Sequence, residues 1–216
     1  HDFPAPLGRF SVLGNHDYTD HDGGSFDFDG NARVQAVVAT LKEVNITVLR
    51  NEAVSLEQNG TAFAVGGVDE VWTNRADVEA TFSKTPFTMR RILLAHNPDI
   101  VKYLGKTPVD LVMAGHTHGG QIRLPIFGAV PQLPTDLGRH YDQGAFDWNT
   151  TLSTQDPSKL TGQKPVNSTK LLITRGIGES DRLRPTFFSS NLTEDGEVAG
   201  LQMTFENGNV KSLRTD

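Results

Sequence analysis

One stretch constrains this chain more than any other: an apolar run that leads into a glycine-flanked pair of histidines. Residues 109–113 (Val-Asp-Leu-Val-Met) indicate a buried strand, and Gly115-His116-Thr117-His118-Gly119-Gly120 follows it. Residues two apart on an extended backbone point to the same side, so we expect both imidazoles to face one place. The glycines allow a sharp turn and leave room beside the histidines. Because neutral imidazole is a common ligand of zinc, manganese and iron, the pattern predicts a metal site.

Two further apolar runs end in ligand-capable residues. Residues 9–13 lead into Gly14-Asn15-His16-Asp17, and residues 91–95 end at His96. Each residue has an ordinary alternative explanation, because Asn15 could occupy a turn and His96 could cap a helix. In open α/β domains, however, sites collect at the carboxyl ends of strands. The sequence therefore predicts that five residues converge at one edge of a sheet: Asn15, His16, His96, His116 and His118.

The remaining periodicity predicts a mixed α/β fold. Helices are expected after Asn31, over 75–82 and over 98–104, and strands alternate with them. Asn59-Gly60 and Asn207-Gly208 indicate hairpin turns between strands. The length of 216 residues suits a single domain, so we expect one unit over the whole chain.

A long segment after the histidine pair has a different character. Residues 125–169 are rich in Pro, Gly, Asp and Thr and show little periodicity. A segment of this length without regular structure is usually functional or disordered, and here it begins at the expected site. We therefore expect a loop insertion at the rim of the site, with Arg123 and Arg139 as candidate phosphate contacts.

Composition excludes several classes of protein. The formal net charge of −6 argues against nucleic-acid binding, which needs a basic surface to meet phosphates. No apolar run has the length of a transmembrane helix. The chain has no cysteine, which removes disulfides, thiolate ligands and cysteine nucleophiles from consideration. Composition does not indicate an oligomeric state.

The chain also carries five Asn-x-Thr sequons, at Asn45, Asn59, Asn149, Asn167 and Asn191. One interpretation is a glycosylated protein that is secreted, periplasmic or exposed at the cell surface. The other is a sequence rich in Asn and Thr in which the sequons carry no meaning, and then a cytoplasmic location is equally open. Both interpretations stay open at this stage.

The order of the three strand-end motifs resembles the calcineurin-like metallophosphoesterases, in their bacterial YkuE-like branch. The resemblance extends over about residues 5–180, and its motifs stand at Val12–Tyr18, Leu94–Asp99, Ala114–Pro125 and Arg175–Gly178. It implies a four-layer α/β/β/α sandwich that binds two divalent metal ions of the Mn, Fe, Zn or Mg class. It also implies hydrolysis of a phosphomonoester or phosphodiester, in a small-molecule or lipid substrate, by a metal-activated hydroxide.

The resemblance also implies a role for each motif residue. Asn15, His96 and His116 would hold one metal ion, and His118 would hold the other. His16 would contact the phosphate and protonate the leaving oxygen, as an imidazole can do near neutral pH. Two ions about 3.5–4 Å apart clamp the attacking and leaving oxygens and activate a bound water. Asp17 has two open roles, to orient His16 or to cap the turn.

This sequence departs from the family in one important respect. Members also carry an Asp-x-His and a Gly-Asp-x-x-Asp motif, and neither occurs in this chain. We therefore expect an N-terminally truncated domain that lacks the first β-α-β unit and carries only part of the dinuclear site. The alternative is a catalytically inactive binding module on the same fold. A metallopeptidase is disfavoured because the chain has no His-Glu-x-x-His segment.

Overall fold

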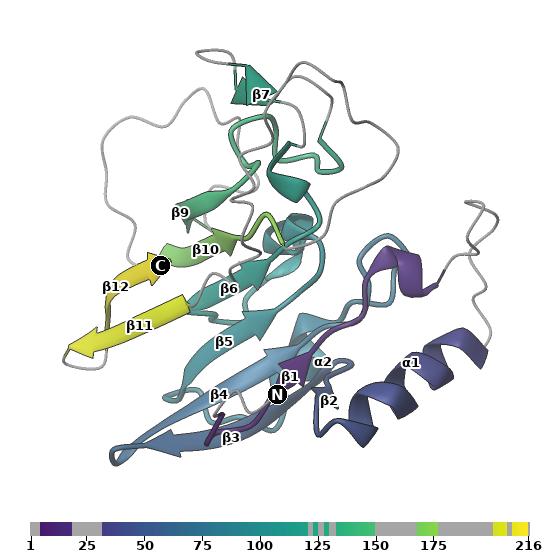
Figure 1. The fold of residues 1–216 in the computed structure, drawn as a ribbon. Coiled ribbons are helices and arrows are strands. Elements are labelled where there is room, and N and C mark those ends of the chain that lie inside the picture. Colours follow the sequence, from purple (N-terminus) through teal and green to yellow (C-terminus); the bar gives the residue numbers. More distant parts are fainter. Residues whose placement is uncertain are drawn as a thin grey trace.

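A mixed six-stranded sheet forms the centre of the protein (Figure 1). The computed structural model describes residues 5–18, 32–120, 123–124, 128–129, 133–149, 168–176, 201–206 and 209–215. In the order of the sheet, the strands are β3 (Glu52–Gln58), β4 (Thr61–Gly67), β5 (Arg90–Leu94), β6 (Leu111–Ala114), β10 (Ser168–Ile173) and β9 (Gly144–Asn149). The four central strands are parallel, and β3 and β9 are antiparallel at the two edges. The carboxyl ends of β4, β5, β6 and β10 therefore lie along one edge of the sheet.

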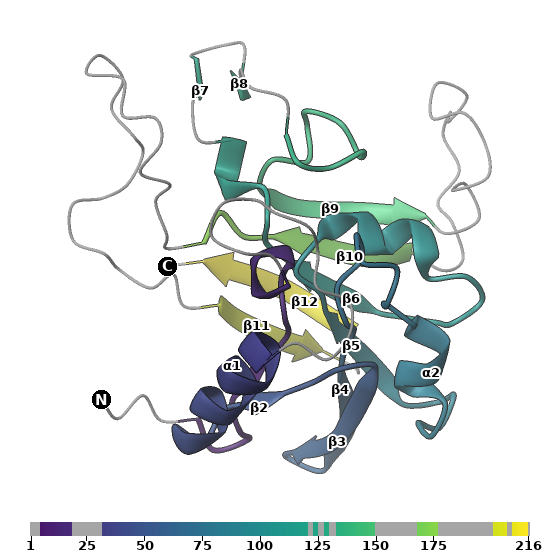
Figure 2. The same cartoon turned by 90° about the vertical axis from the view of Figure 1, so that its right-hand side faces the viewer.

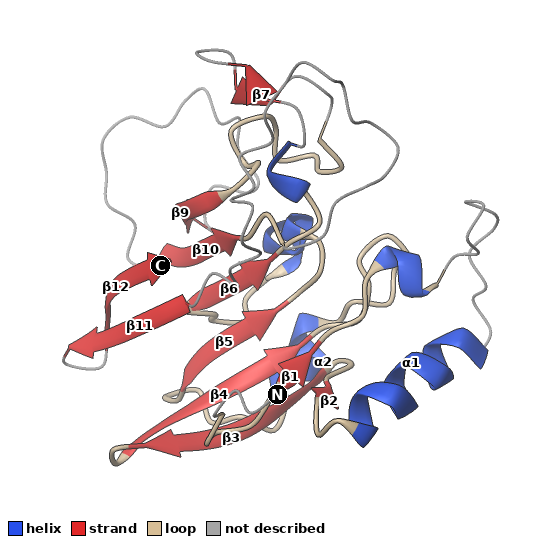
Figure 3. Ribbon diagram, in the orientation of Figure 1, coloured by secondary structure: helices blue, strands red, loops and turns tan. Residues whose placement is uncertain are grey.

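The other elements are two-stranded sheets and helices (Figure 3). The strand pairs are β1 (Phe10–Ser11) with β2 (Thr47–Val48), β7 (Arg123–Leu124) with β8 (Gly128–Ala129), and β11 (Leu201–Glu206) with β12 (Asn209–Thr215). The helices are α1 (Ala32–Glu43) and α2 (Val78–Phe82), with 3₁₀ turns η1 (Asn15–Asp17), η2 (Pro98–Tyr103) and η3 (His118–Gly120).

Side-chain burial shows how the layers are stacked. Successive residues of the central strands enter two different cores, as expected for the period of two along a strand: Leu93 and Val112 belong to one core, and Ile92 and Leu111 to the other. The first core contains residues of α2 and η2, whereas the second contains Leu49, which follows β2. A third core lies between α1 and the β1–β2 layer. Figure 2 shows α1 and α2 on opposite sides of the strands.

The order of layers is therefore α2 with η2, the six-stranded sheet, the β1–β2 pair, and α1. This confirms the predicted α/β fold with a multistranded central sheet. The two β layers lie so close together at position 67 of β4 that only glycine fits there. A Cβ on Gly67 would lie 2.4 Å from Leu49 Cβ and 2.8 Å from Val12 Cγ1. None of the helices that the structure describes has both the length and the apolar character needed to cross a bilayer.

Two of the expected elements differ in detail from the observed ones. The helix expected over 98–104 is the 3₁₀ turn η2, with Pro98 in its first turn and the Asn97 side chain accepting a 2.8 Å hydrogen bond from the backbone nitrogen of Asp99. The helix expected over 75–82 begins later, at Val78, because the Asp77 side chain caps it by accepting from Ala80.

The expected loop over 125–169 is interrupted by β9, which pairs with β10. Phe146 and Trp148 pack on the first core from alternate positions of this strand, and Asp147 between them is exposed. The strand was not predicted because its alternating pattern covers few residues and is surrounded by turn-forming residues. Parts of the segment, including residues 150–167, lie outside the described residues.

Two sequons can be placed in the structure. Asn45 and Asn59 are exposed and have positive φ angles of 60° and 53°. Asn59 and Gly60 form the turn of the β3–β4 hairpin, which confirms the hairpin predicted there. Asn167 and Asn191 lie outside the described residues, as does the side chain of Asn149.

Candidate metal centre

Three ligand-capable side chains from three strand ends meet at one point. Asn15 Oδ1 lies 2.9 Å from His96 Nε2, and the same nitrogen lies 2.9 Å from His116 Nδ1. The two imidazole centroids are 4.6 Å apart with an angle of 62° between the rings. Asn15 follows β1, His96 follows β5 and His116 follows β6, so the strand order brings together residues more than 100 positions apart in the chain.

The η1 turn holds Asn15 by two sets of hydrogen bonds. The Asp17 carboxylate accepts a 2.8 Å hydrogen bond from the Gly14 backbone nitrogen and closes the turn. This is the capping role, one of the two roles left open for Asp17 by the sequence. Tyr18, which follows the turn, is buried and donates its hydroxyl hydrogen bond to the carboxylate of Asp69. Burial and this hydrogen bond raise the pKa of Tyr18 above its ordinary value, so its hydroxyl stays protonated.

The Asp69 carboxylate in turn is held by Arg50. Arg50 donates from Nε at 3.1 Å and from Nη2 at 2.9 Å to the same carboxylate oxygen. The Glu70 backbone nitrogen donates to the other oxygen at 2.8 Å. Asp69, which is 6% exposed, thus connects the loop after β4 to the turn that carries Asn15.

His96 fits into a space that glycine leaves open. A Cβ on Gly14 would lie 2.9 Å from both Cγ and Nδ1 of His96, closer than real side chains approach. The alternative explanation of His96 as a helix cap is wrong, because Asn97 caps η2 and His96 points to Asn15. Gly14 therefore serves as a cradle that lets the His96 ring reach the centre.

The extended backbone predicted for the histidine pair is wrong. His116 and His118 have φ angles of 70° and 53°, in the left-handed region, and Gly119 and Gly120 follow with 60° and 78°. For residues with a Cβ this conformation costs about 1–2 kcal/mol, and such costs cluster at functional sites. The left-handed turns make His116 buried and leave His118 exposed.

Thr117 anchors this turn from between the histidines. Its side chain is buried, and its hydroxyl donates a 2.5 Å hydrogen bond to the Asp142 backbone oxygen. A Cβ on Gly119 would lie 2.9 Å from Arg175 Cβ and 2.9 Å from Gln143 Oε1. The turn is therefore packed against segments that come much later in the chain.

The two remaining predicted residues are neighbours of this cluster. His16 and His118 are exposed, and each exerts an electrostatic influence on both His96 and His116. His16 is part of the same turn as Asn15, and His118 of the turn that follows His116. The structure thus brings the five predicted residues into one region, with direct contacts among Asn15, His96 and His116.

The imidazoles of His96, which is partly buried, and His116, which is buried, are neutral at physiological pH. Burial lowers the pKa of His96 to about 4, although the Asp17 carboxylate acts in the opposite direction. Burial, together with the neighbouring His96, lowers the pKa of His116 to about 3. Neutral imidazoles have a nitrogen lone pair available for a cation. The electrostatics of the site therefore favour metal ligation by these two residues.

The donor set fits a divalent transition metal. Two imidazole nitrogens and one amide oxygen are ligand types that Mn, Fe and Zn accept, and the missing side chain at Gly14 leaves room for the His96 ring. No carboxylate completes the set: the part of the chain that the structure describes contains no group of three or more His, Cys, Asp or Glu placed to hold an ion.

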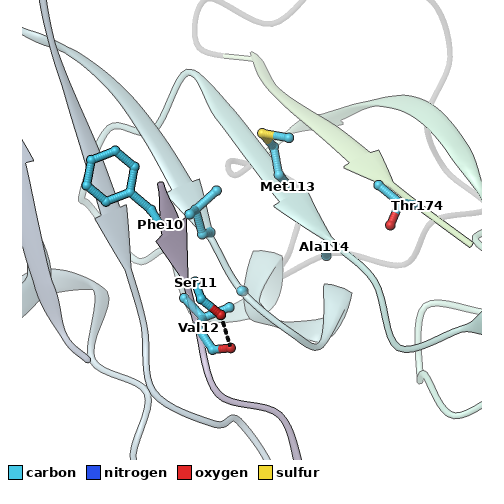
Figure 4. Close-up of a pocket in the computed structure, with 8 residues that line it drawn as sticks. Phe10, Ser11, Val12, Met113, Ala114 and Thr174 are labelled. Atoms are coloured by element: carbon cyan, nitrogen blue, oxygen red, sulfur yellow. Dashed lines mark hydrogen bonds between the residues drawn. The ribbon is translucent and has the colours of Figure 1, made fainter. Parts of the chain in front are cut away.

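The ligand-bearing turns start from the walls of one groove (Figure 4). The groove is lined by residues of β1, β5, β6 and the end of β10: Phe10, Ser11, Val12, Leu94, Ala95, Met113, Ala114 and Thr174. Its lining is mostly apolar, and it lies between the β1–β2 layer and the central sheet. His96 directly follows Ala95 at its edge.

Two further residues lie beside the centre: Trp72, which the sequence did not indicate, and Arg175, the first residue of the Arg175–Gly178 motif. Trp72 makes an edge-to-face contact with His116, with ring centroids 4.6 Å apart. Arg175 lies against Gly119 and thus beside the histidine turn. Of the predicted phosphate contacts, Arg139 is exposed in the segment after β8, and the side chain of Arg123 lies outside the described residues. Only tertiary contacts identify Trp72, because no motif surrounds it.

Comparison with known proteins determines the family. The calcineurin-like phosphoesterase family matches residues 1–120, more than half of the chain. The chain belongs to this family. It is 32% identical over 148 residues to the metallophosphoesterase YkuE of Bacillus subtilis (strain 168), covering 68% of the chain and 47% of YkuE. No solved structure matches it.

Two further relatives carry names that specify a reaction. The phosphodiesterase YaeI of Escherichia coli (strain K12) is 32% identical over 131 residues, covering 61% of the chain and 44% of YaeI. The UDP-2,3-diacylglucosamine pyrophosphatase LpxG of Chlamydia trachomatis is 27% identical over an alignment of 217 positions, covering 83% of the chain and 61% of LpxG. The chain thus spans about half the length of the curated relatives that it matches.

Proposed function

We propose that this chain supplies the histidine and asparagine ligands of a metal-dependent phosphoesterase site. The observation that carries the proposal is the position of His96 Nε2, which lies 2.9 Å from Asn15 Oδ1 and 2.9 Å from His116 Nδ1. Groups that ligate one cation lie about this far apart, and all three are neutral donors of the types that divalent transition metals accept. Membership of the calcineurin-like phosphoesterases and relatives named as a phosphodiesterase and a pyrophosphatase support hydrolysis of a phosphoester or pyrophosphate bond.

Each residue has a part in the proposed reaction. Asn15, His96 and His116 hold a divalent ion, which when bound neutralises phosphate charge and lowers the pKa of water. His16 is exposed beside Asn15 and protonates the leaving oxygen, a role for which an imidazole is suited near neutral pH. We assign His118, which is exposed in the turn after His116, to a second ion as the family resemblance implies.

Metal binding by purified protein tests the proposal directly. We expect His116→Ala to weaken Mn²⁺ binding, measured by calorimetry, by more than about 100-fold, because outer-shell changes alone cost 10–100-fold. Metal-dependent hydrolysis of bis(4-nitrophenyl) phosphate should fall with it. His140→Ala, which removes an exposed histidine, is the matched control and should retain both properties. Equal Mn²⁺ affinity in the two variants would contradict the assignment.

A non-catalytic binding module on the same fold is the second candidate. It is favoured by the lack of a carboxylate-containing ligand group among the described residues. The two candidates differ in one measurable result. A protein that binds Mn²⁺ through His116 but hydrolyses neither phosphomonoesters nor phosphodiesters supports the binding module, whereas metal-dependent turnover excludes it.

A further inference from the structure

Trp72 is a half-exposed aromatic side chain beside the metal centre. It is 46% exposed, and its indole meets the His116 ring edge to face, with an angle of 80° between the rings. The other large apolar side chains that are exposed in the described residues are Val44, Phe87 and Tyr103. Phe87 precedes β5 and therefore lies at the end of that strand opposite to His96. Trp72 contacts a proposed metal ligand, whereas Phe87 is exposed far from it and can serve as a control position.

The loop that carries Trp72 is ordered by buried polar groups. The Glu70 carboxylate is 1% exposed and accepts a 2.8 Å hydrogen bond from the Thr73 backbone nitrogen, while the Thr73 hydroxyl donates to the Glu70 backbone oxygen at 3.0 Å. Burial raises the pKa of Glu70, and backbone hydrogen bonds from Thr73, Trp72 and Val71 oppose this shift. These bonds close the turn around Trp72.

A second set of bonds ties the same loop to the neighbouring hairpin. The Asn51 side-chain oxygen accepts from the backbone nitrogens of Asp69 and Asp77, at 3.0 and 2.9 Å, and its amide nitrogen donates to the Arg75 backbone oxygen at 2.7 Å. The turn is thus fixed on both sides of Trp72. A partner that stacks on the indole does not have to order the loop, and such preorganisation favours binding.

We propose that Trp72 determines substrate specificity by stacking on an aromatic ester group that stays on the phosphate when the leaving group departs. The indole offers a flat apolar surface next to His116, one of the residues that would hold the metal ion to which the phosphate binds. Aromatic rings gain more from such a surface than aliphatic groups of equal area, because offset and edge-to-face arrangements add to the hydrophobic term. The inference rests on the proposed function and adds a substrate class to it: organic phosphoesters that carry a planar ring.

Two diesters with the same leaving group test this specificity. Bis(4-nitrophenyl) phosphate retains an aromatic ester after cleavage of one bond, whereas methyl 4-nitrophenyl phosphate retains a methyl ester. We expect Trp72→Ala to lower the ratio of their kcat/KM values by about fivefold to tenfold, mainly through KM of the aromatic diester. Trp72→Phe should retain most of the ratio, and Phe87→Ala should leave it unchanged. An equal loss for both diesters in Trp72→Ala would overturn the inference.

A binding measurement decides the inference even if the protein has no phosphoesterase activity. The chain has two tryptophans, and the indole nitrogen of Trp148 has no hydrogen-bond partner among the described residues, so Trp148→Phe breaks no such bond. In this variant Trp72 is the sole tryptophan. We expect phenyl phosphate, added to Mn²⁺-loaded protein, to quench its fluorescence at concentrations at least fivefold below those of methyl phosphate. Equal quenching by the two ligands, or none by phenyl phosphate, would overturn the proposal.

Discussion

The turn that carries Asn15 and the turn that carries His116 are held in place by different means. The η1 turn, which carries Asn15, has no residue with a positive φ angle and is fixed from outside by Tyr18 and Asp69. The turn at 115–120, which carries His116, has four residues with positive φ. The η1 turn thus depends on side-chain hydrogen bonds, and the turn at 115–120 depends on a left-handed backbone against which later segments pack. Different kinds of substitution should therefore disable them.

The largest effect on the η1 side is expected from Asp69→Ala. This change leaves the Tyr18 hydroxyl buried without its acceptor and removes the partner of Arg50, so we expect a loss of about 2–3 kcal/mol in the free energy of unfolding. Urea denaturation measures it. Asp147→Ala, in the exposed pair with Lys170, is the control and should cost less than about 0.5 kcal/mol. Similar losses in both variants would show that the Asp69 network does not hold the turn.

In the turn at 115–120, a methyl group added at a closely packed left-handed glycine should be more harmful than one added at a left-handed glycine in open space. Gly119→Ala places a Cβ in the left-handed region and 2.9 Å from Arg175 Cβ, so we expect a loss of about 2 kcal/mol in stability. Gly105→Ala has the same strain at a φ of 57° but meets nothing within 4 Å, and should cost about 1 kcal/mol. Thermal unfolding compares the two. Equal losses would mean that the contact with Arg175 contributes nothing.

The smallest loss of stability is expected for a substitution of Gly14, which should act mainly on metal binding. Gly14 has an extended backbone, so Gly14→Ala introduces no strain but pushes the His96 ring away from Asn15. We expect Mn²⁺ affinity to fall about tenfold, in the range found when the surroundings of a metal ligand are changed, with a loss of about 1 kcal/mol in stability from the contact itself. Gly115→Ala is the matched control, because its Cβ would lie 3.8 Å from Thr174 Oγ1, an ordinary contact. If both variants bind Mn²⁺ equally, the space that Gly14 leaves for the His96 ring does not contribute to metal binding.

Sequence reasoning could predict where the ligands converge because the relevant signals are local. Each of the three apolar runs is a few residues long, and the polar residue at its end is visible without any tertiary information. Parallel packing of β5 and β6 then places His96 and His116 together. The family resemblance rests on the same three stretches, and the match over residues 1–120 confirms it.

Tertiary structure decided the properties that depend on distant contacts. Trp72 reaches His116 only because β4 pairs with β5 and β5 pairs with β6, and Asp69 meets Tyr18 across 51 positions of sequence. The left-handed conformation of His116 and His118 contradicts what an isolated His-x-His pattern suggests, since packing of the turn against Asp142 and Arg175 compensates its strain. By itself, the sequence determined which donors stand at the ends of the strands, because strand and turn signals are local. Only the folded chain decided how these donors are aimed and what flanks them, because packing energies are summed over segments that the sequence keeps apart.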